Sequence, residues 1–252
     1  MKKLFLALLA LFLISCSSSD SSSNSVTTDS VLIKKTIQTT TGSTENPIIN
    51  NFTYNGNKLN TITSNEGMIQ KFFYTGDLIT RLEWYVDNSG IAIVFVYTYN
   101  DNGKLTNMTR TDNLVSQAFR IAYTHNADGT ITLNQYSRID NSPEEFDGLS
   151  KYFMTSTNEI ERKEDYNAAK TLVTNTTTFI YDAKNNPFKN ILGWNKLLLE
   201  SGGFYTNVTS IVDINGTQTS SYQYNDHDFP ILGTQSFSGN PTASIVKEYI
   251  YE

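Results

Sequence analysis

Apolar and aromatic positions alternate with polar positions in short runs along most of this chain, and turn-forming residues separate the runs. In residues 95–110 an aromatic run ends at Tyr99, a polar segment follows, and a second run begins near Leu105. Tyr and Thr suit the pleated surface of a strand, whereas Asn, Asp and Gly tolerate the positive φ angles of tight turns. The unit therefore predicts a β-hairpin, and variants of it recur from Phe52 to the C-terminus.

The hairpin units share an anchor residue just before the turn. These anchors are Tyr54, Tyr74, Tyr99, His125, Tyr181 and Tyr224. Their uneven spacing is typical of a meander rather than a regular solenoid. We therefore predict an all-β fold with about fourteen to sixteen strands. It would be an antiparallel meander of hairpins that forms a curved sheet or a barrel-like single domain over residues 31–252.

Some segments allow finer predictions. In residues 78–86, Leu82 and Trp84 share one face while charged residues occupy the other, which is the period of an antiparallel strand with one polar face. Residues 91–97 are apolar on both faces, so we expect this strand to be covered on both sides. Residues 139–149 are acidic and contain a proline, which predicts a longer loop.

The hairpin pattern breaks after residue 187. Apolar residues then fall at approximately helical spacing, and a Ser-Gly-Gly sequence at 201–203 follows as a stop signal. We predict one short amphipathic helix near residues 188–200, of about two to three turns, packed over an end or a face of the sheet. Its Trp and Leu residues are expected to belong to the core; lining a ligand cavity is the alternative.

The first sixteen residues predict a targeting signal. An apolar stretch from Leu4 to Ile14 follows two lysines, and it is shorter than the roughly 20 residues that span a bilayer. Residues 13–16, Leu-Ile-Ser-Cys, resemble a bacterial lipobox. The resemblance implies a signal peptide over residues 1–15 and lipidation of Cys16. An ordinary signal peptide with an unrelated cysteine is the alternative.

The residues after Cys16 predict a flexible tether. Residues 17–25 are almost all Ser, so we assign 16–30 to the acylated Cys and a Ser-rich tether. Ser17 rather than Asp at the second position favours an outer-membrane lipoprotein, with a periplasmic or a surface-facing orientation left open. Because Cys16 is the only cysteine, the processed chain would have no thiol for a disulfide, a metal or catalysis.

The formal net charge of the 252 residues is −6, and removing the two leader lysines changes it to −8. An acidic chain with no basic cluster argues against nucleic acid as a partner. The expected partner is instead the membrane, through the N-terminal lipid, with a glycan or an envelope protein as further possibilities.

The repeat units resemble those of a known family. Residues 99–106 and 181–187 resemble the YD repeats of Rhs-type shell proteins. Together with the lipobox and the Ser-rich tether, they resemble a family of uncharacterised Bacteroides-type lipoproteins with a porin-like fold. The resemblance covers most of the chain from about Ile48 onward. It implies a curled antiparallel sheet or barrel and carries over no catalytic residue.

A membrane-embedded barrel is a less favoured arrangement. The strands of such barrels carry an outward apolar band of about 9 to 11 residues each. Here Thr, Asn, Arg and Glu occupy the second face of many strands. The pattern favours a soluble sheet tethered to the membrane by its lipid.

Candidate catalytic and metal-binding groups are sparse. Residues 226–228, Asp-His-Asp, offer three ligands, but they fall where another unit has an ordinary turn. Glu144, Glu145 and Asp147 would need a further carboxylate across a cleft for glycoside hydrolysis, so we interpret them as a solvated acidic loop. No Gly-x-Ser-x-Gly elbow occurs. We predict no enzyme, no cofactor and no metal site.

The aromatic residues give the best functional indication. One face of a curved sheet could present Tyr85, Tyr97, Tyr123 and Tyr136 together, and such rings stack on sugars or anchor protein partners. The leading hypothesis is a non-enzymatic, lipid-anchored envelope module that binds glycan or protein, or has a structural role. The alternative is a carrier of an apolar ligand such as lipid in the concave sheet, favoured if the lumen exceeds about 300 Å³. A hydrolase is third.

Overall fold

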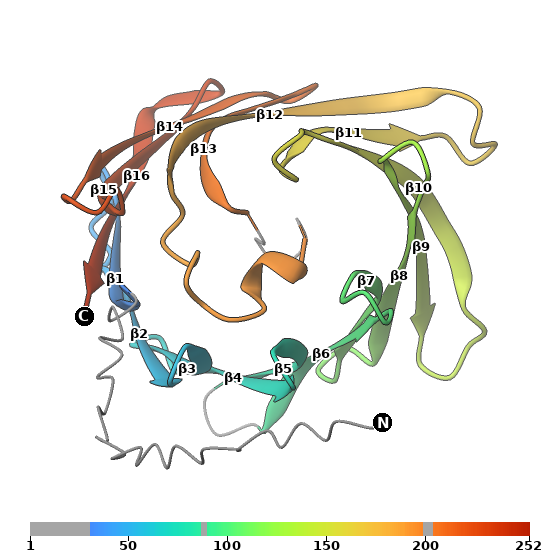
Figure 1. Cartoon of the computed structure of the whole chain (residues 1–252), viewed down its shortest axis with the longest axis horizontal. Coiled ribbons are helices and arrows are strands. Elements are labelled where there is room, and N and C mark those ends of the chain that lie inside the picture. The colour runs from blue at the N-terminus through green and yellow to red at the C-terminus, as the bar shows by residue number, and fades with distance from the viewer. Residues whose placement is uncertain (1–30, 87–89, 199–203) are drawn as a thin grey trace, which may run out of the picture.

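The computed structural model of the chain describes residues 31–86, 90–198 and 204–252. The predicted signal peptide, Cys16 and the Ser-rich tether lie outside the described residues. Sixteen strands form one closed barrel (Figure 1). The strands are β1 (Ile33–Thr40), β2 (Ile48–Asn55), β3 (Lys58–Ser64), β4 (Met68–Thr75), β5 (Leu78–Val86), β6 (Ile91–Tyr99), β7 (Leu105–Asp112), β8 (Gln117–His125), β9 (Ile131–Ile139), β10 (Glu145–Met154), β11 (Ile160–Tyr166), β12 (Val173–Asn185), β13 (Thr206–Asp213), β14 (Gly216–Tyr224), β15 (Pro230–Phe237) and β16 (Asn240–Tyr251).

Each strand pairs antiparallel with its sequence neighbour, and β1 closes the barrel by pairing with β16, for example Ile37 with Glu248. This confirms the predicted antiparallel meander and decides between the curved sheet and the barrel. Closure pairs the edges of the two terminal strands, which leaves the sheet without a free edge. Among the described residues, no helix is long and apolar enough to cross a membrane.

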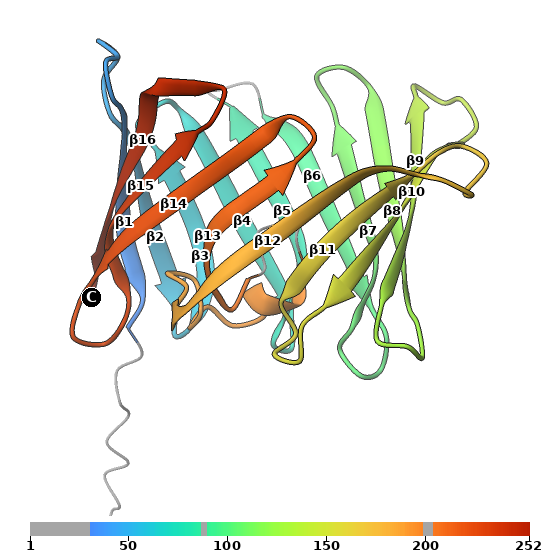
Figure 2. The ribbon, with the colours of Figure 1, turned by 90° about the horizontal axis from the view of Figure 1, so that it is seen from above.

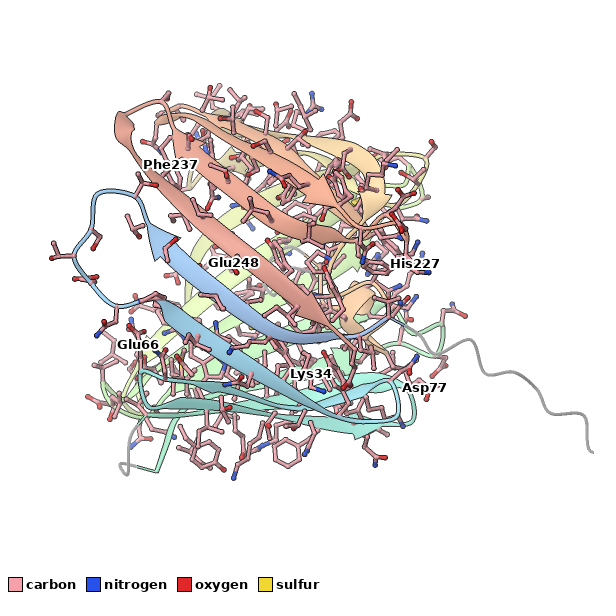
Figure 3. The ribbon with its side chains drawn as sticks, turned by 90° about the vertical axis from the view of Figure 1, so that its left-hand side faces the viewer. Lys34, Glu66, Asp77, His227, Phe237 and Glu248 are labelled. Carbon is pink, nitrogen blue, oxygen red and sulfur yellow. The ribbon has the colours of Figure 1, made fainter. Side chains whose placement is uncertain are left out.

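The two ends of the barrel are built differently. Turns that follow even-numbered strands, such as β2–β3 and β4–β5, lie at one end together with the start of β1 and the end of β16 (Figure 2). We call this the plug end, and the opposite one the far end. In Figure 3, Lys34, Asp77 and His227 lie toward the plug end, whereas Glu66 and Phe237 lie toward the far end.

A ring of anchor residues fixes the plug end. Tyr54, Tyr99 and Tyr181 donate their hydroxyl hydrogens to the backbone oxygens of Ile33, Ile79 and Ile160, 20 or 21 residues earlier in the chain. His125 makes the equivalent contact, with its Nε2 2.8 Å from the oxygen of Leu105. The structure thus confirms that His125 takes the place of a Tyr anchor. Burial raises the pKa of these Tyr hydroxyls.

An aliphatic belt packs inside the ring of anchors. One apolar residue at or next to the start of each of six strands, β1, β3, β5, β7, β9 and β11, is almost fully buried in the core. The belt consists of Ile33, Leu59, Ile79, Leu105, Ile131 and Ile160, with exposed fractions of 0 to 4%. The repeated Tyr and Leu or Ile of each hairpin unit therefore build one continuous core at one end of the barrel.

The plug is the connection between β12 and β13, described over residues 186–198 and 204–205, which folds into the lumen (Figures 1 and 2). The predicted helix at 188–200 is described only up to residue 198, and over that part it is reduced to one 3₁₀ turn, Trp194–Lys196. Gly193 has φ 76°, and a Cβ on it would lie 2.6 Å from the Asp77 oxygen. Close approach to the barrel wall therefore replaces helix continuation at this residue.

Hydrogen bonds hold the plug against β1 to β5. The Leu192 N–H donates to the Asn57 oxygen, and the Asn190 side chain donates to the Val31 oxygen. Aromatic pairs join Phe188 to Phe52 and Trp194 to Phe72, with ring centroids 6.0 Å apart in both pairs. The plug consequently lies inside the barrel, rather than over an outer face of the sheet.

Two local predictions are wrong. Residues 139–149 are mostly strand rather than loop, because Glu145 and Phe146 at the start of β10 pair with Ser137 and Tyr136 of β9. Strand β6 is covered only on its luminal side, since Val96 on the outer side is 41% exposed. An apolar residue on the outer face of this strand is therefore not a sign of burial on both sides.

Candidate functional site: a luminal cavity

A cavity of about 500 Å³ occupies the lumen between the plug and the inner wall formed by β4 to β9. Alternation along each strand aims its apolar members inward, because Phe72 and Leu82, then Leu82 and Phe95, are cross-strand partners on the same face. The wall residues are Gln70, Phe72, Leu82, Trp84, Phe95, Tyr97, Met108, Arg110, Phe119, Arg120, Ile121, Gln135 and Tyr136, with Asp147 of the neighbouring β10. Trp194 and Leu197 of the plug close the cavity at one end.

Aromatic residues form a large part of the cavity lining. The Trp84 and Phe95 rings lie 5.4 Å apart between centroids, and the Phe95 ring stacks on Tyr97 at 6.4 Å. On the plug side, Trp194 contacts both Phe72 and Phe188. Both tryptophans of the chain therefore line this one cavity. A lining of this kind is suited to an apolar molecule.

Few polar groups face the cavity. Arg110 on β7 forms an ion pair with Asp112, 3.2 Å between its Nη2 and Oδ2. Two buried donors, Trp84 Nε1 and Arg110 Nε, have no hydrogen-bond partner among the described residues. The side-chain amide of Gln135 is already hydrogen-bonded within the protein: it donates to the Ser150 hydroxyl, which in turn donates to Asp165.

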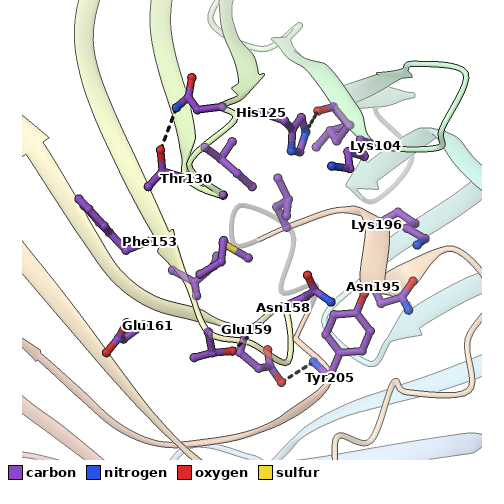
Figure 4. A pocket seen from close by; sticks show the side chains of 18 of the residues that line it. Lys104, His125, Thr130, Phe153, Asn158, Glu159, Glu161, Asn195, Lys196 and Tyr205 are labelled. Carbon is purple, nitrogen blue, oxygen red and sulfur yellow. Dashed lines mark hydrogen bonds between the residues drawn. The ribbon is translucent and has the colours of Figure 1, made fainter.

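A second, more polar cavity of about 730 Å³ lies at the plug end between the plug and the turns that follow β6, β8 and β10 (Figure 4). Its buried carboxylate, Glu159, accepts hydrogen bonds from the N–H groups of Tyr205 and Thr206 and from the Thr206 hydroxyl. Burial raises the pKa of Glu159. These bonds hold the start of β13 in place, so we interpret Glu159 as structural.

The structure does not bring the four predicted tyrosines together. Tyr97 and Tyr123 are 3% and 5% exposed and belong to the core on the luminal side. Tyr85 is on the outer face, where Lys71 lies 4.3 Å from its ring. Tyr136 is at the border of the cavity, and Arg120 lies 4.1 Å from its ring. Ligand binding by any of them stays a prediction.

The residues weighed for metal or carboxylate chemistry are engaged in other contacts. His227 lies in the turn between β14 and β15, where Asp228 pairs with Lys184. Glu144 accepts a bidentate hydrogen bond from Arg120. Over the described ranges, no group of three potential ligands converges on one point.

Sequence reasoning found the stripe of the plug but missed most of the cavity. Trp194 and Leu197 pack in the core, as predicted, and they also lie at the cavity wall, where Leu197 is 1% exposed. The local pattern does not distinguish Trp84, Phe95 and Arg110 from other strand residues. Their signal was the inward face of consecutive strands, which becomes a site only when the sheet closes.

Comparison with known proteins finds solved structures of similar fold, and it finds no matching family. No family model and no curated protein matches this chain. Among solved structures, a porin-like protein from Bacteroides vulgatus matches with a TM-score of 0.53 and 13% identity, covering 88% of this chain and 99% of that one. A porin-like protein from Bacteroides uniformis matches with a TM-score of 0.50 and 15% identity, covering 87% and 96%. The chain thus has a porin-like fold, as the resemblance implied.

Proposed function

We propose that this protein is a non-enzymatic, lipid-anchored barrel of the outer membrane or cell envelope that carries an apolar ligand in its lumen. The observation that supports carriage is the aromatic cavity of about 500 Å³, which is within the usual range for small-molecule sites. The glycan- or protein-binding module has less support, because the predicted aromatic face is divided between the core and the outer wall.

The outer face supports attachment by a lipid rather than by the strands. At mid-strand it carries the ion pair of Arg81 with Glu83, 2.6 Å apart, and that of Arg162 with Glu164, 3.4 Å apart. An Arg or Lys on the lipid-facing side of a membrane barrel costs about 2–4 kcal/mol at the midplane. The proposed anchor at Cys16 would enter at the plug end, where Asn190 holds Val31. The plug would then face the membrane.

Both tryptophans line the cavity, so their fluorescence reports occupancy directly. We expect a long-chain apolar ligand to shift the emission of the purified protein to shorter wavelength, because it displaces water from the two rings. Ile121→Phe adds bulk on the luminal side of β8 and should weaken binding several-fold. Ala122→Phe, the neighbouring residue on the outer side, is the matched control. Equal binding by the two variants would refute carriage in the lumen.

Attachment is tested separately from carriage. Cells fed a labelled fatty acid should incorporate it into the protein, and Cys16→Ser should abolish the label and release the protein from the membrane fraction. A labelled Cys16→Ser protein would contradict anchoring at this residue. It would leave the luminal binding experiment unaffected.

A further inference from the structure

We infer that the luminal cavity takes an apolar ligand carrying neutral oxygen acceptors, such as an ester, amide or ketone, and that Trp84 is a specificity-determining residue. This inference rests on the proposed carriage function and names the class of ligand. It starts from the three buried donors that have no partner in the described structure, Trp84 Nε1, Arg110 Nε and Arg162 Nε. The first two belong to residues that line the same cavity.

The two donors flank one ring. Phe95 on β6 contacts the Trp84 ring from β5 and is the cross-strand partner of Arg110 on β7. Trp84 and Arg110 therefore border the cavity on either side of Phe95. An indole N–H and the Nε–H of a guanidinium group donate hydrogen bonds and cannot accept them. A ligand that satisfies them must supply acceptor atoms.

The charge at this position argues for a neutral acceptor. The guanidinium of Arg110 is already paired with Asp112, whose side chain is only 15% exposed. Asp147 also borders the cavity. A ligand carboxylate would lose its hydration without gaining an uncompensated cation, which is unfavourable in an aromatic environment. A carbonyl oxygen accepts the same N–H groups without that loss.

The other charged groups at the cavity border add no uncompensated positive charge. Arg120 donates to both oxygens of Glu144, so its charge is compensated. The carboxylate of Asp147 accepts from the Ser137 hydroxyl. The balance at the border is thus neutral to acidic, and an anionic ligand is disfavoured.

The experiment compares three ligands of similar chain length on the full-length protein, held in a tryptophan-free amphipathic polymer. Methyl decanoate has a neutral ester, undecane has no acceptor, and decanoate is charged. Affinities are obtained from tryptophan fluorescence, with the polymer alone as the blank for partitioning. We expect methyl decanoate to bind more tightly than decanoate. Tighter binding of decanoate would overturn the neutral-acceptor inference while leaving carriage intact.

Trp84→Phe removes the N–H and retains an aromatic ring. Losing one hydrogen bond should weaken the binding of methyl decanoate about two- to tenfold. The same change should leave undecane binding nearly unchanged, because the indole N–H has no partner either before or after a hydrocarbon binds. This difference between ester and hydrocarbon separates a hydrogen bond from a general change of packing.

Trp194→Phe is the matched control. Trp194 lines the same cavity, but it already makes interactions within the protein. Its replacement should therefore change the affinities for ester and hydrocarbon in the same direction. If Trp84→Phe also changes both in the same direction, the assigned role of Trp84 is wrong. If the wild type binds none of the three ligands, the proposed carriage function fails together with this inference.

Discussion

The plug end and the cavity are two regions of one barrel built from the same hairpin unit, yet they treat polar groups in opposite ways. At the plug end, the hydroxyls of Tyr54, Tyr99 and Tyr181 bond to backbone oxygens. At the cavity, donors on Trp84 and Arg110 are buried without a partner in the described structure. The repeated residues of the hairpin units thus build the plug end, whereas residues at other positions of the same strands line the luminal cavity.

The largest expected effect is in the aliphatic belt. Ile79 is fully buried, so Ile79→Ala should destabilise the barrel by about 2–5 kcal/mol. Ile180→Ala, on the outer face with 52% exposure, is the control and should change stability by less than about 1 kcal/mol. Urea unfolding followed by circular dichroism measures both. Similar losses in the two variants would show that the belt is not the main core.

The contact between the plug and the wall is tested by Gly193→Ala. The added Cβ would meet the Asp77 oxygen at 2.6 Å in a backbone conformation with φ 76°. We expect a loss of at least about 2 kcal/mol and a red shift of Trp194 emission as the plug moves. Gly129→Ala, with φ 83° and no atom within 4 Å, should show only the smaller conformational cost. Equal losses of stability in the two variants would mean that the barrel wall tolerates a Cβ at residue 193.

The anchor ring is tested by Tyr99→Phe, which leaves the Ile79 oxygen without its donor. The expected loss is about 1–2 kcal/mol in thermal or urea unfolding. Tyr85→Phe removes a hydroxyl that donates to Glu83 on the outer face, where water can substitute. A greater loss for Tyr85→Phe than for Tyr99→Phe would contradict the distinction between a buried anchor and a surface contact.

The smallest effect is the pH dependence that Glu159 contributes. Burial raises its pKa above the unfolded value of 4.5, so the folded state binds the proton more tightly than the unfolded state. This contribution to stability is present below the unfolded pKa and is lost as pH rises through the folded one. Glu159→Gln should therefore gain stability relative to wild type as pH rises from about 4.5. A constant difference between the two proteins across that range would refute the assignment.

Much of the fold could be predicted from local chemistry. The polar turns and the anchors, including His125 in place of a Tyr, indicate hairpins, and their number indicates about fourteen to sixteen strands, of which the structure has sixteen. The start of β10 and the outer face of β6 could not be predicted, because both depend on partner strands. The helical pattern of residues 188–198 failed for the same reason: contacts of Gly193 with the wall outweigh local helix propensity.

Period-two alternation and turn residues act within one hairpin, so local chemistry alone establishes an antiparallel meander. Only the tertiary structure decided that β1 meets β16, that the plug folds inside, and that Trp84, Phe95 and Arg110 surround one cavity. The physical reason is that the two effects act over different distances along the chain. Alternation fixes which side chains share a face, but closure of the sheet decides whether that face meets water, a core or a ligand.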